Sequence, residues 1–150
     1  MKSLTALLLS LFVAASVYAG AWGEGSFEND DALDWVAECT NAKSIEPVSL
    51  ALESVLKGGY IEAPQGSAAI AAAEVVAAAI GKPSSKFPPE LQAWVKRMPT
   101  KKLAQLAPTA KKALARIKDT KSSELKQLWS EGKQNHWSAV IVELESRLGK

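Results

Sequence analysis

The chain has 150 residues, of which 47% are apolar and 23% charged, and its formal net charge is +2. A single domain of this size buries enough surface to hold a hydrophobic core, so no metal or disulfide staple is required. Cys39 is the only cysteine, which excludes an intramolecular disulfide. It lies inside a predicted helix, so we expect a buried, unreactive thiol, with an intermolecular disulfide as the alternative.

The first residues have the three parts of a secretory signal peptide. Lys2 supplies the positive start, residues 4–17 are apolar and uncharged, and small residues lead up to Ala19. We therefore expect cleavage after Ala19, a signal peptide over 1–19 and a single mature domain over 20–150, periplasmic or secreted. An uncleaved membrane anchor is the alternative, but the apolar run is shorter than the roughly 20 residues that span a bilayer.

Charge is divided unevenly along the mature chain. Residues 20–81 contain ten acidic residues and two lysines, whereas residues 82–150 contain fifteen basic and six acidic residues. The simpler interpretation is that the two halves pack through complementary faces. The alternative is a basic surface for an anionic polymer or cell surface. Its candidate contacts are Lys96, Arg97, Lys101, Lys102, Lys111, Lys112, Lys118, Lys121 and Lys126.

Helix signals follow an extended arm with glycine turns over residues 20–28. Asn29 is a good N-cap for a helix that runs to about residue 42. Beyond it, Pro47 stands near the start of a second helix, whose apolar residues recur at helical spacing until a pair of glycines at 58–59. The acidic half therefore predicts an arm and two amphipathic helices before its most apolar segment.

That apolar segment, residues 68–80, is composed almost entirely of Ala, Ile and Val. Ser67 can cap the helix and Gly81 can end it, while residues 60–66, which contain Pro64, are expected to form a loop. A helix that is apolar around its whole circumference is normally buried. We expect this segment to be the central core helix, because it is too short for a membrane span.

The basic half predicts further helices and no strands. No run of alternating β-branched residues and no hairpin signal is present. The expected helices are a short one from Pro89 to Pro99, one over 103–117 with a kink or a new start near Pro108, one from Ser123 to Gly132, and a last one capped by Asn135. The sequence therefore predicts a compact all-α domain of about six to seven helices with an extended N-terminal arm.

Three motifs resemble a bacterial family of domains of unknown function, DUF4259. They are WGxGxFxNDDAxDW at 22–35, AAAEVV at 71–76 and SELxxLW at 123–129, and the tail over 137–148 also fits. The resemblance covers essentially the whole mature chain but implies no established activity. The signature residues, which we expect to be structural, are Trp22, Gly23, Gly25, Phe27, Asn29, Asp30, Asp31, Asp34 and Trp35.

Glu74 is the strongest single candidate for a functional side chain. It is the only charged residue between Glu62 and Lys82, and it stands among alanines and valines. A buried carboxylate has to be paired or protonated, because isolated burial of its charge is costly. The functional interpretation is a general base or a ligand. The structural interpretation is a hydrogen bond with the arm or an ion pair with Arg97, Arg116 or Arg147.

The arm itself suggests contacts rather than chemistry. We expect its two glycines to let the backbone pass close to the core while Trp22 and Phe27 dock there as anchors. The acidic residues over 24–34 fail as an EF-hand loop, since Ala32 and Trp35 occupy positions that need an oxygen ligand and a glycine. Capping and the helix dipole account for them more simply, and an irregular cation site remains the alternative.

Too few residues are available for the familiar catalytic constellations. His136 is the only histidine, so neither a histidine metal site nor a Ser-His-Asp triad has enough members, and we expect it on the surface. The sequence predicts no catalytic residue, metal or cofactor. It predicts a small, non-enzymatic, exported binding module with a protein partner in the envelope or secreted fraction, and no nucleic-acid partner. The alternatives are the anionic-surface binder and a hydrolytic or metal-dependent enzyme built on Glu74.

Overall fold

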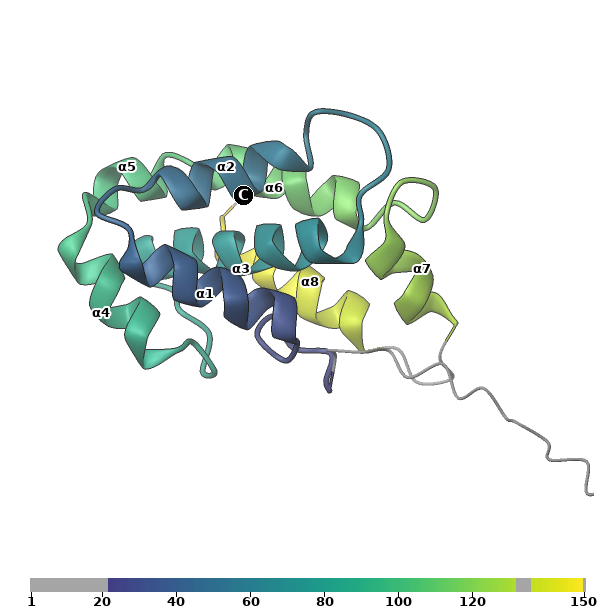
Figure 1. Ribbon diagram of the computed structural model, residues 1–150, viewed down its shortest axis with the longest axis horizontal. Helices are drawn as coiled ribbons and strands as arrows, with labels where there is room; N and C mark the ends of the chain where they lie inside the picture. Colours follow the sequence, from purple (N-terminus) through teal and green to yellow (C-terminus); the bar gives the residue numbers. More distant parts are fainter. Residues whose placement is uncertain (1–21, 132–135, 150) are drawn as a thin grey trace, which may run out of the picture.

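The computed structural model describes residues 22–131 and 136–149, and these ranges contain eight α-helices and no β-strand (Figure 1). The helices are α1 (Asp30–Asn41), α2 (Glu46–Ser54), α3 (Ala63–Ala79), α4 (Pro89–Arg97), α5 (Thr100–Ala104), α6 (Ala107–Ile117), α7 (Glu124–Ser130) and α8 (Trp137–Arg147). The predicted all-α class is confirmed. The predicted signal peptide lies outside the described residues.

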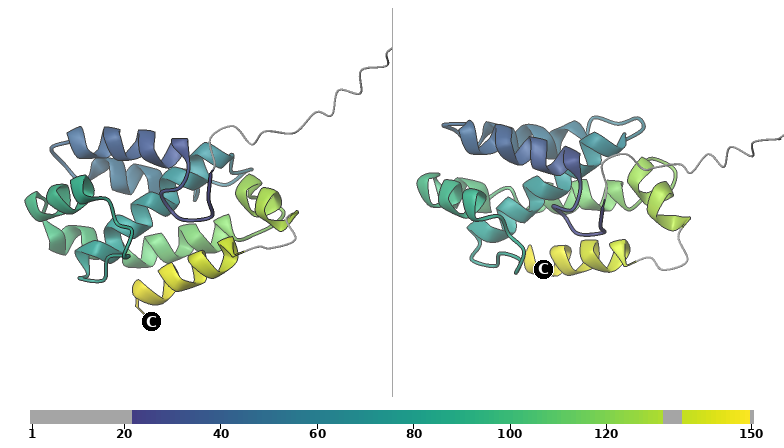
Figure 2. Two further views of the ribbon diagram at one scale, coloured as in Figure 1. Left: turned by 90° about the horizontal axis from the view of Figure 1, so that it is seen from below. Right: turned by 60° about the horizontal axis from the view of Figure 1, so that its bottom comes forward.

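Helix α3 is the centre of the fold, and it packs against each of the other seven helices. Figures 1 and 2 show it enclosed by its neighbours. Every residue from 69 to 77 is buried, which confirms the predicted central helix. Its many alanines let the surrounding helices approach its backbone closely. No helix of the described ranges is both long enough and apolar enough to cross a membrane.

The predicted start of this helix was wrong. α3 begins at Ala63, so residues 63–66 are helical rather than a loop, and Ser67 is buried inside the helix instead of capping it. The N-cap is Glu62, whose side chain and that of Gln65 form a reciprocal capping box. Pro64 fits because a proline in the first helical turn lacks only an N–H that would have no partner there.

Proline also explains why there are eight helices instead of six or seven. Pro108 stands in the first turn of α6, so it begins a new helix instead of bending a longer one, and the short α5 precedes it. At α8 the N-cap position is His136, while the predicted cap Asn135 and the predicted end of α7 at Gly132 lie outside the described residues.

The turn after α3 sends the chain toward the N-terminal arm. Gly81 has a φ of 88°, a left-handed conformation that glycine adopts without steric cost, and its N–H donates to the carbonyl of Ala78 at 2.9 Å. The N–H of Lys82 donates to the carbonyl of Ala77 at 2.9 Å. The helix therefore ends in a satisfied cap, and the loop over 82–88 leaves it beside the arm.

Buried aromatic and apolar side chains hold the outer helices on this centre. Trp94 of α4 is fully buried, and its indole N–H donates to the carbonyl of Ala42, at the end of α1, at 2.9 Å. Trp137, Ile141 and Leu144 bury one face of α8. These buried residues recur at the spacing of one helix face, as expected for an amphipathic helix packed on a core.

The state of Cys39 gives a direct test of this core. The side chain is fully buried, and burial, together with the nearby charge of Glu38, raises the pKa of the thiol to about 12. Because the thiolate is the reactive form, we expect no alkylation of the native protein by iodoacetamide at about pH 8. Complete alkylation should follow in concentrated guanidinium chloride. Intact-mass spectrometry would measure both, and rapid modification of the native protein would contradict the packing of α1.

Candidate functional site

The arm before α1 closes into a loop around Glu28. The N–H groups of Trp22 and Gly23 donate to the main-chain carbonyl of Glu28 at 3.1 and 3.2 Å. The N–H of Gly25 donates to the carboxylate of Glu28 at 2.8 Å, and Lys86 binds the other carboxylate oxygen at 2.8 Å. Lys86 and this backbone hydrogen bond hold the pKa of Glu28 below its usual value. The arm is therefore locked to the loop after α3.

A side chain on either arm glycine would displace the carboxylate of Glu28. A Cβ on Gly25 would lie 2.7 Å from Oε2 of Glu28, and a Cβ on Gly23 would contact the same oxygen. The glycines therefore allow close contact between their own backbone and Glu28, which is also in the arm. The sequence had suggested close contact between the arm and the core instead. Phe27 does pack inward, edge-on against Phe87 with ring centroids 5.9 Å apart, but Trp22 is 60% exposed and is not an anchor.

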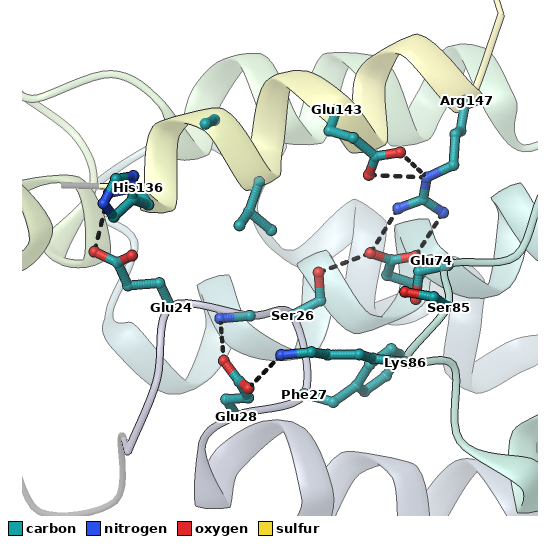
Figure 3. Close-up of a pocket in the computed structure, with 14 residues that line it drawn as sticks. Glu24, Ser26, Phe27, Glu28, Glu74, Ser85, Lys86, His136, Glu143 and Arg147 are labelled. Atoms are coloured by element: carbon teal, nitrogen blue, oxygen red, sulfur yellow. Dashed lines mark hydrogen bonds and ion pairs between the residues drawn. The ribbon is translucent and has the colours of Figure 1, made fainter.

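Glu74 joins the arm, α3 and α8 in one buried cluster (Figure 3). Its side chain is 2% exposed, and its carboxylate forms a two-pronged ion pair with Arg147, with Nη1–Oε2 at 2.8 Å and Nη2–Oε1 at 2.9 Å. The hydroxyl of Ser26 in the arm donates to Oε1 at 2.7 Å. Of the three arginines considered as partners of Glu74, Arg147 is the one that pairs with it.

Arg147 uses its remaining donors to extend the cluster. Its Nε donates to both carboxylate oxygens of Glu143, at 2.7 and 3.0 Å, and Nη1 donates to the carbonyl of Lys82 at 3.1 Å. Burial by itself would lower the pKa of Arg147, but the hydrogen bonds and charges of Glu74 and Glu143 outweigh it and raise that pKa. The guanidinium stays charged and ties α8 to the end of α3.

An open pocket of about 590 Å³ lies beside this cluster, between the arm, the loop at 84–86 and α8 (Figure 3). We call it the arm pocket. Its charged lining consists of Glu24, Glu28, Glu74, Glu143, Lys86 and Arg147, and its apolar lining consists of Phe27, Ala139 and Val140. Gly25, Ser26, Ser84, Ser85 and His136 complete the lining.

The lining of the pocket has a surplus of negative charge. Four glutamates face one lysine and one arginine, so with a neutral histidine the lining has two more negative than positive charges. Glu24 accepts a hydrogen bond from the main-chain N–H of His136 at 3.0 Å, which fixes this carboxylate at the start of α8. Glu143 is 58% exposed although it binds Arg147. Both carboxylates therefore remain accessible to a ligand.

The first two acidic residues of α1 lie in its first turn, where they suit the helix dipole. Asn29 caps the helix, since its side chain accepts the N–H of Ala32 at 2.8 Å, and the exposed Asp30 and Asp31 occupy the first turn. Burial, followed by the charges of nearby carboxylates, raises the pKa of Asp31. Within 22–131 and 136–149, no three potential ligands gather closely enough to hold a metal ion.

The nine candidate cations divide into two kinds. Three of them reach across to α8. Lys111 donates to the carbonyl of Gly149 at 2.6 Å, Lys118 pairs with Glu145 at 2.7 Å, and Lys126 donates to the hydroxyl of Ser138 at 3.3 Å. These three contacts hold segments of the basic half together. Ion pairs that join the acidic and the basic half are Lys86–Glu28 and Arg147–Glu74. The other six are exposed, namely Lys96, Arg97, Lys101, Lys102, Lys112 and Lys121.

Several pocket residues were missed by sequence reasoning. Lys86, Glu143 and Ser26 have ordinary surface surroundings in the sequence, and no spacing signal connects them with Glu74. Ser26 is 48 residues from its partner Glu74, and Arg147 is 73 residues away. The isolated position of Glu74 in an apolar helix was the one signal available, and it indicated that a partner was needed without identifying it.

The fold and the pocket define a class of protein: an all-α domain that surrounds one buried, alanine-rich helix and is closed at one side by a glycine-containing arm. The chain belongs to the family described as domain of unknown function (DUF4259), whose model matches residues 20–140. The resemblance seen in the motifs is confirmed. Comparison with the curated proteins and with the solved structures finds no match. Glu143 and Arg147 lie beyond the matched range.

The buried cluster predicts a large cost for neutralising Glu74. Glu74→Gln leaves the Arg147 charge largely buried without its main counter-ion, and we expect a loss of about 3–5 kcal/mol in the free energy of unfolding. Urea titration followed by circular dichroism would measure it. Combining the change with Arg147→Met should recover part of the loss, since the uncompensated charge is then gone.

Glu143→Gln is the matched control, because Glu143 binds the same guanidinium but is 58% exposed. We expect that variant to lose less than about 1 kcal/mol. Equal losses for the two glutamine variants, or a Glu74→Gln protein as stable as the parent, would contradict a central role for the buried pair.

Proposed function

We propose that this protein is an exported, non-enzymatic binding module whose arm pocket receives a basic side chain of a partner protein. The observation that carries the proposal is the surplus of carboxylates in the pocket, four glutamates against one lysine and one arginine. The secretory character of residues 1–19 supports the export part of the proposal.

The internal pairing of the pocket favours a cationic ligand over an anionic one. Lys86 is bound to Glu28, and Arg147 is bound to Glu74 and Glu143, so both positive groups are already neutralised by the protein. An incoming anion would meet the surplus carboxylates and be repelled. An incoming cation would be attracted, and its attraction would add to specificity as well as to the rate of encounter.

The shape of the lining favours a lysine or arginine side chain. Such a side chain has an apolar stem and a charged end, and it places the stem on apolar surface while the charge stays in a polar surrounding. Phe27, Ala139 and Val140 offer the apolar wall, and Glu24 and Glu143 offer the acceptors. A pocket of about 590 Å³ is within the range of sites that hold small ligands.

The enzyme alternative has less support. A general base needs a carboxylate oxygen within reach of a substrate proton. Both oxygens of Glu74 are bound by Arg147, and one also accepts the hydroxyl of Ser26. The carboxylate of Glu74, the candidate base, therefore binds groups of α8 and the arm and has no oxygen without a partner.

A peptide titration tests the pocket. We expect the amides of Ser26 and Val140 to shift in NMR spectra when acetyl-glycyl-arginyl-glycinamide is added. The norleucine counterpart should bind roughly tenfold more weakly, because it loses about 1.4 kcal/mol of attraction to the two accessible carboxylates. Equal binding of the two peptides would contradict a charge-selective pocket.

Two tryptophan variants make the control. Ala139 is exposed and lines the pocket, so Ala139→Trp should fill it and abolish binding of the arginine peptide. Ala115 is equally exposed on α6 and does not line the pocket, so Ala115→Trp should bind the peptide as the parent does. Loss of peptide binding in both variants would show that the peptide does not bind specifically in the arm pocket.

Export has its own test. The protein recovered from the envelope or the culture fluid should begin at Gly20, as N-terminal sequencing would show, because the peptidase recognises the small residues that end at Ala19. Ala19→Arg should leave the leader attached. A protein found inside the cell with its first 19 residues intact would contradict the proposed export.

A further inference from the structure

Four exposed cations gather where α4 meets α5. Lys96 and Arg97 form the end of α4, and Lys101 and Lys102 belong to α5. Among the described residues, none of the four takes part in an ion pair, and the sequence has no acidic residue from 91 to 118. We call these four residues the basic corner. Its charge is therefore not neutralised by the protein, unlike that of Lys118 or Arg147.

The position of the basic corner makes it accessible to a broad partner. α4 and α5 lie together at one end of the long axis, with α7 at the opposite end (Figures 1 and 2). The exposed large apolar side chains of the described ranges lie elsewhere in the sequence, at Trp22, Leu33, Leu50, Tyr60, Ile80 and Val142. The nearest tryptophan, Trp94, is fully buried. The segment that carries the corner therefore has exposed cations and no exposed large apolar side chain.

We propose that the basic corner docks the protein on the anionic phospholipid headgroups of a membrane surface. The four cations are exposed and close in sequence at one end of the long axis, so we expect that they can approach a plane of phosphates together. Each lysine or arginine close to an anionic membrane strengthens binding about fivefold. A single-stranded nucleic acid fits less well, because such sites combine cations with exposed aromatic rings on which bases stack.

The chemistry of the corner also sets how the protein would bind. Because α4 and α5 have no exposed large apolar side chain to insert into the acyl region, the attachment is electrostatic and reversed by salt. The arm pocket takes no part in this contact, and the proposal does not depend on the ligand proposed for that pocket. A membrane-docked protein would still present the arm and α8 to a second partner.

Vesicle sedimentation tests the proposal. The mature protein, residues 20–150, is mixed with vesicles of phosphatidylglycerol and phosphatidylcholine, or of phosphatidylcholine alone, at low and high NaCl. We expect binding only to the anionic vesicles and only at low salt. The combined variant Lys96→Gln, Arg97→Gln, Lys101→Gln and Lys102→Gln should bind at least about tenfold more weakly, given a fivefold effect per cation.

A second variant with the same net charge is the control. Lys43, Lys57, Lys112 and Lys121 are also exposed but lie outside the corner, and their combined change to Gln should retain most of the binding. Ala139→Trp should bind vesicles as the parent does, which separates this result from the test of the arm pocket.

Three outcomes would overturn the proposal. They are an equal loss of binding in the two fourfold glutamine variants, equal binding to neutral vesicles, and corner-dependent binding to a soluble polyanion such as heparin without binding to the anionic vesicles. Circular dichroism of each variant confirms that the fold is unchanged, which is expected because the altered side chains are exposed.

Discussion

The burial of α3 on every side is the constraint on which the rest of the structure depends. The helix can sit at the centre because alanine, isoleucine and valine cover its whole surface, but Glu74 places a carboxylate in the same surroundings. An unpaired charge there would cost several kcal/mol, far more than any surface ion pair returns. Its neighbours therefore have to supply a cation and a hydrogen-bond donor, and this requirement positions both the arm and α8.

The arm pocket follows from that requirement. Arg147 reaches Glu74 from α8, Ser26 reaches it from the arm, and the carbonyl of Lys82 accepts from the same guanidinium. Three segments that are distant in sequence are thereby fixed around one carboxylate, and the space between them stays open to solvent. Residues 24–28 of the arm form one side of this space.

The features predicted well from sequence all depend on a few neighbouring residues. The Asn29 cap, the amphipathic faces and the apolar central segment are local patterns, and each was found where expected. The errors in the predicted helix starts also concern local patterns, because a proline is common in two kinds of backbone structure. Pro64 indicates a loop or a first helical turn, and Pro108 indicates a kink or a new start. In both cases the neighbouring elements selected the helix start.

By itself, the sequence determined the all-α class, the burial of the central helix, the family and the need of Glu74 for a partner. Only the tertiary structure decided that Arg147 is the arginine that pairs with Glu74 and that Lys86 pairs with Glu28. It also decided which lysines contact α8, as Lys118 does, and which form the basic corner. Capping and periodicity act over about one helical turn. The pairings of Glu74 with Ser26 and Arg147 join residues 48 and 73 positions apart, and only the packing of whole helices brings such residues together.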